Sequence, residues 1–187
     1  MSRNRRQIPI EERRSELVAA ATDLFLRMGY DGATLADIGA AAGVTRSNIY
    51  WYFKSKDEVF AAVMEQMLSR EIRALATEHA GLDPLSRLTR GLVDMRFYRP
   101  LHQAMHDRLQ HSEAVRAAHD AWLDWMRELI VELLDERGAG IDRALVTDIV
   151  LTVFEGVNVP GEHRRPAHEM IRFIMETVLA APQRQVG

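Results

Sequence analysis

Apolar residues recur along almost all of this 187-residue chain at the three- and four-residue spacing of helices. No segment sustains the alternation of apolar and polar residues, enriched in β-branched side chains, that is typical of strands. The first predicted helix covers about residues 11–28 and ends before Gly29, which can adopt a left-handed cap conformation. The pattern therefore predicts an all-α protein.

Capping residues mark several of the predicted helix starts. Hydroxyl side chains suited to an N-cap stand at Thr34, Thr45 and Ser55. Farther along, Asp83 and Pro84 are suited to the cap and first position of another helix. We expect a helix from about residue 94 that is interrupted near Pro100. The remaining predicted helices cover about residues 34–43, 45–53, 55–80, 112–137, 141–157 and 167–180.

Composition excludes several classes of protein. The absence of cysteine rules out disulfides and thiolate metal sites, and no apolar run approaches the ~20 residues of a membrane span. We expect a cytoplasmic protein without membrane association. The net charge is −3, but residues 1–56 hold nine Lys and Arg against six Asp and Glu, whereas residues 57–187 hold fifteen against twenty-one. This asymmetry suggests that the first third meets an anionic partner.

Two glycines between residues 35 and 53 have the spacing of a helix-turn-helix. Gly39 would let a second helix backbone approach closely, and Gly43 would supply a turn with positive φ. The side chains expected to form the shared core are Ile38, Ala42, Val44, Ile49 and Tyr52 or Phe53. The chain is thus predicted to contain a steep helix corner, although such corners also occur in proteins that do not bind DNA.

The face opposite that core is polar and aromatic. By helical spacing it carries Arg46, Ser47, Tyr50 and Trp51. A helix that begins at Thr45 directs free N–H groups toward phosphates, while Arg and Ser side chains can bind base edges. Thr34 is a candidate phosphate ligand, and Lys54 and Lys56 are the chain's two lysines. Arg3, Arg5 and Arg6 are either a DNA-binding arm or a solubilising tail.

The stretch FLRMGYDGATLADIGAAAGVTRSNIYWYFKSKDEVF lies within residues 19–60, and this region resembles the N-terminal domain of the TetR family of transcriptional regulators. The resemblance implies a dimeric all-α repressor whose C-terminal domain binds a small effector. We expect a DNA-binding domain over residues 1–55 and an effector and dimerisation domain over residues 56–187. The DNA contacts that the resemblance implies are Thr34, Thr45, Arg46, Ser47, Tyr50, Trp51 and Lys56. Ser47 stands where the family often has Gly, and Trp51-Tyr52 replaces the common Tyr or Trp followed by His, so the preferred DNA sequence is expected to be unusual.

The last two predicted helices are broadly apolar. Residues 141–157 carry apolar side chains around most of the helix, which is typical of burial on more than one side. Gly156 would permit close helix contact. We therefore expect a homodimer through the last two helices, and its two-fold symmetry predicts an approximately palindromic operator.

Bulky aromatic and polar side chains mark a candidate effector pocket. Its predicted lining is Arg96, Phe97, His102, His106, Trp122, Trp125 and Phe154. An ordinary core stripe through Trp122 and Met126 is the competing interpretation. His102 and His106 have metal-compatible spacing, yet we expect no metal and no cofactor, because no third ligand is fixed by the sequence. The two histidines bind effector or metal, or only pack.

These observations favour a ligand-released repressor over an enzyme. The sequence contains no phosphate-binding glycine loop, nucleophile elbow, complete zinc motif or convincing pair of catalytic carboxylates. The alternatives are a small helical ligand-binding protein, or an enzyme in which the N-terminal helix corner is only scaffold.

Overall fold

The computed structural model describes residues 9–94, 98–135, 142–158 and 165–180, and this part of the chain is built from helices without strands. The all-α prediction is confirmed. The helices are α1 (Ile10–Gly32), α2 (Leu35–Ala41), α3 (Arg46–Ile49), α4 (Lys56–Thr77), α5 (Pro84–Asp94), α6 (Arg99–Arg108), α7 (Glu113–Asp135), α8 (Arg143–Asn158) and α9 (Ala167–Ala180). Within the described ranges, no helix has both the length and the apolar character to cross a membrane. The predicted arm residues Arg3, Arg5 and Arg6 and the pocket candidates Arg96 and Phe97 lie outside the described residues.

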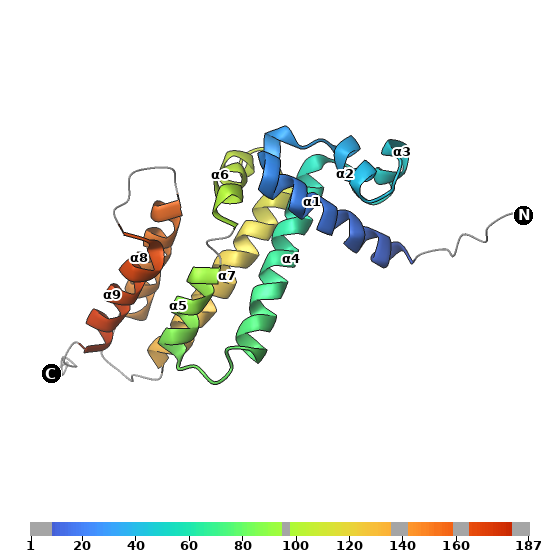
Figure 1. Ribbon diagram of the computed structural model, residues 1–187. Helices are drawn as coiled ribbons and strands as arrows, with labels where there is room; N and C mark the ends of the chain where they lie inside the picture. Colours follow the sequence, from blue (N-terminus) through green and yellow to red (C-terminus); the bar gives the residue numbers. More distant parts are fainter. Residues whose placement is uncertain (1–8, 95–97, 136–141, 159–164, 181–187) are drawn as a thin grey trace, which may run out of the picture.

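The helices form two regions on either side of a central helix pair. α4 and α7 run side by side through the body, with α1–α3 at one end and α8 and α9 on the opposite side (Figure 1). α6 lies between these regions, since it contacts α1, α7 and α8. α6 therefore contacts helices of both regions, α1 of the N-terminal group and α8 of the C-terminal pair.

Local signals in the N-terminal third are confirmed in detail. Gly29 and Gly43 have positive φ values of 73° and 66°, as expected, but Gly29 forms a kink inside α1, which ends at Gly32 and not at residue 28. Thr34 caps α2 in a reciprocal capping box with Asp37. At the start of α4, Ser55 accepts a hydrogen bond from the Glu58 N–H. The side chain of Glu58 accepts from the Lys54 N–H instead of completing the box at Ser55 itself.

Two other expected helix boundaries are wrong. α3 ends at Ile49 and is followed by turns. The Thr45 side chain makes no capping hydrogen bond, and its hydroxyl lies 3.2 Å from that of Ser47. Pro100 does not interrupt a helix that starts near Asp94. It occupies the first turn of α6, where the missing N–H has no helical acceptor to lose.

Two apolar cores hold the chain together. The first joins α1–α3 to the first half of α4, to α6 and to the start of α7, with Phe25 and Phe60 fully buried near its centre. The second joins α5, the remainder of α7, α8 and α9 around Met126 and Ile130. The first core runs across residue 55, so α4 anchors the N-terminal helices directly to the rest of the molecule.

Candidate functional site

A close backbone approach fixes the corner between α2 and α3. A Cβ atom on Gly39 would lie 2.8 Å from the carbonyl oxygen of Val44, which is closer than real Cβ atoms come. The Val44 N–H donates a hydrogen bond of 2.7 Å to the Gly39 carbonyl. Gly39 therefore lets the turn fold back onto α2, as the sequence predicted.

Apolar side chains beneath this corner hold α3 in place. Ile38 and Ile49 are fully buried, and Phe53 is 2% exposed. Ala42 and Val44 are partly buried against the same core. Because one side of residues 45–51 is held by these contacts, the other side must face outward.

The outward surface formed by residues 45–51 is polar and aromatic, and we call it the outer face. Trp51 is 86% exposed and Tyr50 is 49% exposed, as expected from helical spacing. Thr45, Ser47 and Asn48 are also exposed. The backbone of Arg46 begins α3, while its side chain lies outside what the structure describes. Sequence reasoning missed Asn48, although its position three residues before Trp51 was the available signal.

Thr34 lies at the exposed N-terminus of α2. Its N–H and its hydroxyl both donate to the Asp37 carboxylate, at 3.0 and 2.6 Å. These hydrogen bonds hold the pKa of Asp37 below its usual value. A phosphate at this position would have to compete with Asp37 for the Thr34 donors.

Lys56 lies at the start of α4 and faces the loop after α1. Its Nζ donates to the carbonyl oxygens of Tyr30 and Ala33, at 2.8 and 3.1 Å, and sits 4.0 Å from the centre of the Tyr30 ring. Burial lowers the pKa of Lys56 against the opposing effect of nearby carboxylates. In this structure the Lys56 ammonium joins the start of α4 to the end of α1, and the phosphate contact expected from the sequence stays a prediction.

An ion pair next to Lys56 joins α4 to α6. Arg108 donates to both oxygens of Asp57, at 3.0 and 2.7 Å, and the Tyr30 hydroxyl also donates to Asp57. Burial alone would raise the pKa of Asp57, but these donors lower it below its usual value. The carboxylate thus stays ionised and links the last turn of α6 to the base of the helix-turn-helix.

A small apolar cavity lies among α4, α6, α7 and α8. It measures about 50 Å³, and three of the predicted pocket residues, His102, Trp122 and Phe154, line it. Trp122 is also part of the core stripe with Met126, so its core role is confirmed and its role in effector binding stays a prediction. Trp125 lies outside the lining and packs edge-on against Trp122, with ring centres 5.3 Å apart. The cavity is smaller than the several hundred Å³ typical of ligand pockets.

A larger polar cavity adjoins the small one. It measures about 550 Å³ and shares Met67 and Tyr98 with the small cavity. The charged residues that line it are Arg70, Glu71, Arg73, Glu78, Arg90 and Asp94. Sequence reasoning missed this lining, since these residues are far apart in the chain.

Glu71 is an uncompensated acid in the wall of this cavity. It is 7% exposed, and its Oε1 has no hydrogen-bond partner among the described residues. Burial, followed by the nearby charge of Asp94, raises the pKa of Glu71 to about 7. Between about pH 4.5 and 7, Glu71 therefore keeps its proton in the folded chain and loses it in the unfolded chain, where its pKa has the ordinary value of 4.5.

We expect Glu71→Gln to stabilise the chain at alkaline pH. Because the pKa of Glu71 is raised in the folded state, the stability of the wild-type chain falls as pH rises from about 4.5 to 7. The neutral amide avoids this loss, so the variant should gain roughly 2 kcal/mol relative to wild type between pH 5 and 8.5. Urea unfolding at the two pH values measures the difference. Glu65→Gln, at an exposed position of the same helix, should show no such gain, and an equal pH response in the two variants would contradict the assignment.

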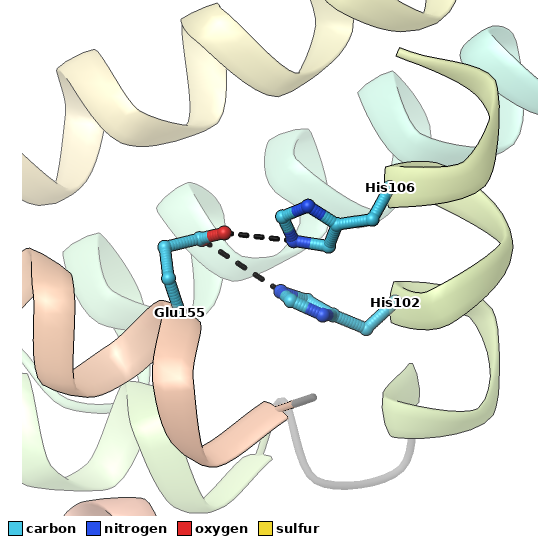
Figure 2. Close-up of side chains that lie close together, drawn as sticks. All are labelled: His102, His106 and Glu155. Carbon is cyan, nitrogen blue, oxygen red and sulfur yellow. Dashed lines mark ion pairs between the residues drawn. The ribbon is translucent and has the colours of Figure 1, made fainter. Parts of the chain in front are cut away.

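His102 and His106 point from α6 toward Glu155 of α8 (Figure 2). The Nε2 atom of His106 lies 2.7 Å from one Glu155 oxygen, and that of His102 lies 3.7 Å from the other. Burial would raise the pKa of Glu155, but contacts with His102 and His119 and the histidine charges lower it to about 2. His106 therefore belongs to an ionic cluster beside the small cavity and is not part of its lining.

Apolar side chains remain exposed on the last two helices. On α8, Leu145 and Ile149 are 55% and 41% exposed, and Thr152 and Gly156 continue the same face with helical spacing. Phe173 of α9 is 70% exposed. Exposed apolar side chains of this size are typical of a protein contact when they lie together on one surface.

Comparison with known proteins bears on the N-terminal helices first. Residues 17–63 match the model of the family described as bacterial regulatory proteins, tetR family. The probable acrEF/envCD operon repressor of Escherichia coli K12 is 40% identical over 84 residues, which are 43% of this chain and 37% of that relative. The chain thus matches well under half the length of this curated relative.

Solved structures match nearly the whole fold at low identity. A tetR-family transcriptional regulator from Streptomyces coelicolor aligns with a TM-score of 0.70 and 21% identity over 91% of this chain and 80% of that chain. A putative transcriptional regulator from Saccharomonospora viridis, solved in complex with choline, aligns with a TM-score of 0.63 and 18% identity over 89% of this chain and 95% of that one. At such identity these matches establish the shared fold.

Proposed function

We propose, on the premise that this chain belongs to the TetR family through its N-terminal domain, that it is a dimeric DNA-binding regulator released from its operator by a small effector. The single observation that carries the proposal is the exposed outer face held over a buried corner, with Gly39 against Val44. Residues 1–55 bind DNA and residues 56–187 bind the effector and the second subunit. The named repressor function of the Escherichia coli relative supports repression as the mode of regulation.

The outer face enters the major groove. Arg46 and Ser47 meet base edges, and Tyr50 and Trp51 contact thymine methyls, sugars or phosphates. Thr34 and Thr45 bind phosphate from the N-termini of α2 and α3. We leave Lys56 out of the direct contacts, because its ammonium already binds two backbone carbonyls.

The second subunit covers the exposed face of α8 and α9. Burying Leu145, Ile149 and Phe173 removes the largest apolar side chains that these helices leave in water. Two symmetric copies would form a four-helix contact, with the open side of Gly156 allowing close approach. The paired outer faces, about 34 Å apart, would then enter successive major grooves of an approximately palindromic operator.

The effector occupies the two adjoining cavities. The small apolar cavity receives an apolar group and the larger one, with its charged lining, orients a polar group. The choline of the Saccharomonospora viridis structure supports a small ligand in this fold. A ligand that favours the nonbinding state by about 4 kcal/mol would weaken operator binding a thousandfold. Movement of α4 and α6 carries this change through the Asp57–Arg108 pair.

Gel shifts on the DNA that flanks the chain's own gene test this proposal. We expect specific binding with a steep salt dependence, because phosphate contacts release counterions. Arg46→Ala should cost roughly 1–3 kcal/mol at the preferred site and relax base preference. Arg127→Ala, on the exposed side of α7, serves as the control for lost charge. Equal loss on specific and nonspecific DNA would assign Arg46 to phosphate contact, and absence of any specific complex would refute the proposal.

A further inference from the structure

Three side chains with metal-binding atoms converge where α6 meets α8. His102 and His106 come from α6 and Glu155 comes from α8, and all three point into one space (Figure 2). One donor atom from each lies within 4.8 Å of the other two. The histidines are four positions apart in the helix, so both rings leave the same side of it and meet the carboxylate together.

A fourth donor approaches from α7. The Nε2 atom of His119 lies 3.7 Å from the Glu155 oxygen that His106 contacts, and the His106 and His119 rings are 5.5 Å apart. The other ring nitrogen of His119 lies 3.6 Å from Asp120. An outer carboxylate can orient an imidazole ligand when it accepts a hydrogen bond from the second ring nitrogen, and Asp120 would have to come closer than 3.6 Å to do so.

The donor atoms are buried without hydrogen-bond partners in the described part of the chain. They are both ring nitrogens of His102, Nε2 of His106, Nε2 of His119 and Oε1 of Glu155. The side chains of His102 and His119 are each 10% exposed. The short contact of His106 with Glu155 has ion-pair distance but lacks hydrogen-bond alignment. A cation would give these unpartnered atoms a partner, since the lone pairs of neutral imidazole nitrogens and of a carboxylate are metal ligands.

We propose that His102, His106 and Glu155 bind a divalent transition-metal ion, with His119 or water as a fourth ligand. Imidazole and carboxylate ligands suit Zn²⁺, and the two histidines with one glutamate match a known zinc donor set. Tetrahedral bonds of about 2.0–2.1 Å place donor atoms roughly 3.3–3.5 Å apart. His106 and His102 lie 2.7 and 3.7 Å from different oxygens of Glu155, and the three donor atoms lie within 4.8 Å of one another, so the side chains would have to adjust to complete a tetrahedral site. Glu155 supplies the third ligand whose absence argued against metal in the sequence.

A bound ion would fasten α6 to α8. His106 stands two residues before Arg108, which holds Asp57 at the base of the helix-turn-helix. The ion would thus stiffen the segment that links the C-terminal helices to α4. The metal site itself does not depend on the proposed DNA function, and its test below uses no DNA.

Zinc binding by the full chain without a polyhistidine tag tests the proposal. The protein is first stripped with a chelator, and ZnCl₂ is then titrated in a calorimeter, with bound metal counted by elemental analysis. We expect one Zn²⁺ per chain and a higher midpoint of thermal unfolding when zinc is present. His102→Gln and Glu155→Gln should each weaken binding at least tenfold, since even loss of an outer ligand partner costs roughly 10- to 100-fold.

His111→Gln is the matched control, because His111 is exposed just beyond α6 and outside the cluster. This variant should keep the affinity of the wild-type chain. Co²⁺ titration of the wild-type chain gives a second readout that needs no variant: a four-coordinate site produces intense visible absorption. The proposal is overturned by absence of stoichiometric zinc binding, by visible bands no stronger than those of hydrated Co²⁺, or by unchanged binding in either cluster variant.

Discussion

Gly39→Val is expected to abolish specific operator binding and to destabilise the N-terminal helices. A Cβ at this position would already lie 2.8 Å from the Val44 carbonyl oxygen, and the two methyl groups of valine enlarge the clash. The turn would have to move away from α2. This movement would shift the outer face so that it no longer fits the major groove of the DNA. We expect a loss of about 1–3 kcal/mol in the free energy of unfolding and at least a hundredfold loss of operator affinity, about 2.7 kcal/mol.

Ala40→Val provides the control for the same substitution in the same helix. Ala40 is exposed, so valine there meets no backbone and costs only its lower helix propensity, about 0.7 kcal/mol or less. Urea unfolding and gel shifts on both variants separate the steric effect from propensity. If Gly39→Val unfolds and binds like Ala40→Val, the close approach does not determine the corner.

Phe173→Glu is expected to produce a monomer. The Phe173 ring is 70% exposed in the single chain, and the proposed dimer would bury it. A carboxylate there would have to lose its hydration without a partner, and two-fold symmetry imposes this cost twice per dimer. Sedimentation should show a shift from dimer to monomer. Operator affinity should fall by two or more orders of magnitude, because a monomer meets only one half-site.

Two further variants make the dimer test specific. Leu145→Glu changes the other helix of the proposed contact and should have the same effect. Arg172→Glu changes the charge of an exposed neighbour of Phe173 on a different side of α9 and should leave the dimer intact. If the wild-type chain sediments as a monomer at micromolar concentration, the proposed dimer does not form. If the variants stay dimeric, the second subunit contacts another surface.

The outer face could be predicted because its cause is local. Residues 45–51 form one short helix and the turn that follows it, so the burial of Ile49 on one side leaves Tyr50 and Trp51 facing the other. Gly39 and Gly43 follow from the same short stretch, since a turn with positive φ and a close backbone contact both need a residue without a side chain. The start of α6 near Pro100 was missed, because proline is compatible with the first turn of a helix as well as with its interruption.

Only some of the residues predicted to line the pocket share one cavity, and the reason is different from that for the missed helix boundary. His102, Trp122 and Phe154 line one cavity, but Trp125 packs behind it and His106 turns to Glu155. Residue type gives the chemistry of a pocket wall, while the angle between packed helices decides which side chains share a cavity. Such angles depend on many side chains at once and are not written in the spacing along one helix.

Amino-acid order alone thus determined the helices, their caps, the tight corner and the direction of the outer face, because each arises from residues a few positions apart. Only the folded chain decided that Glu155 meets two histidines about fifty residues earlier, that Arg108 binds Asp57, and that Lys56 turns inward. Those contacts join different helices. Their formation depends on how the apolar faces of different helices pack together, and the spacing of residues along one helix does not determine that packing.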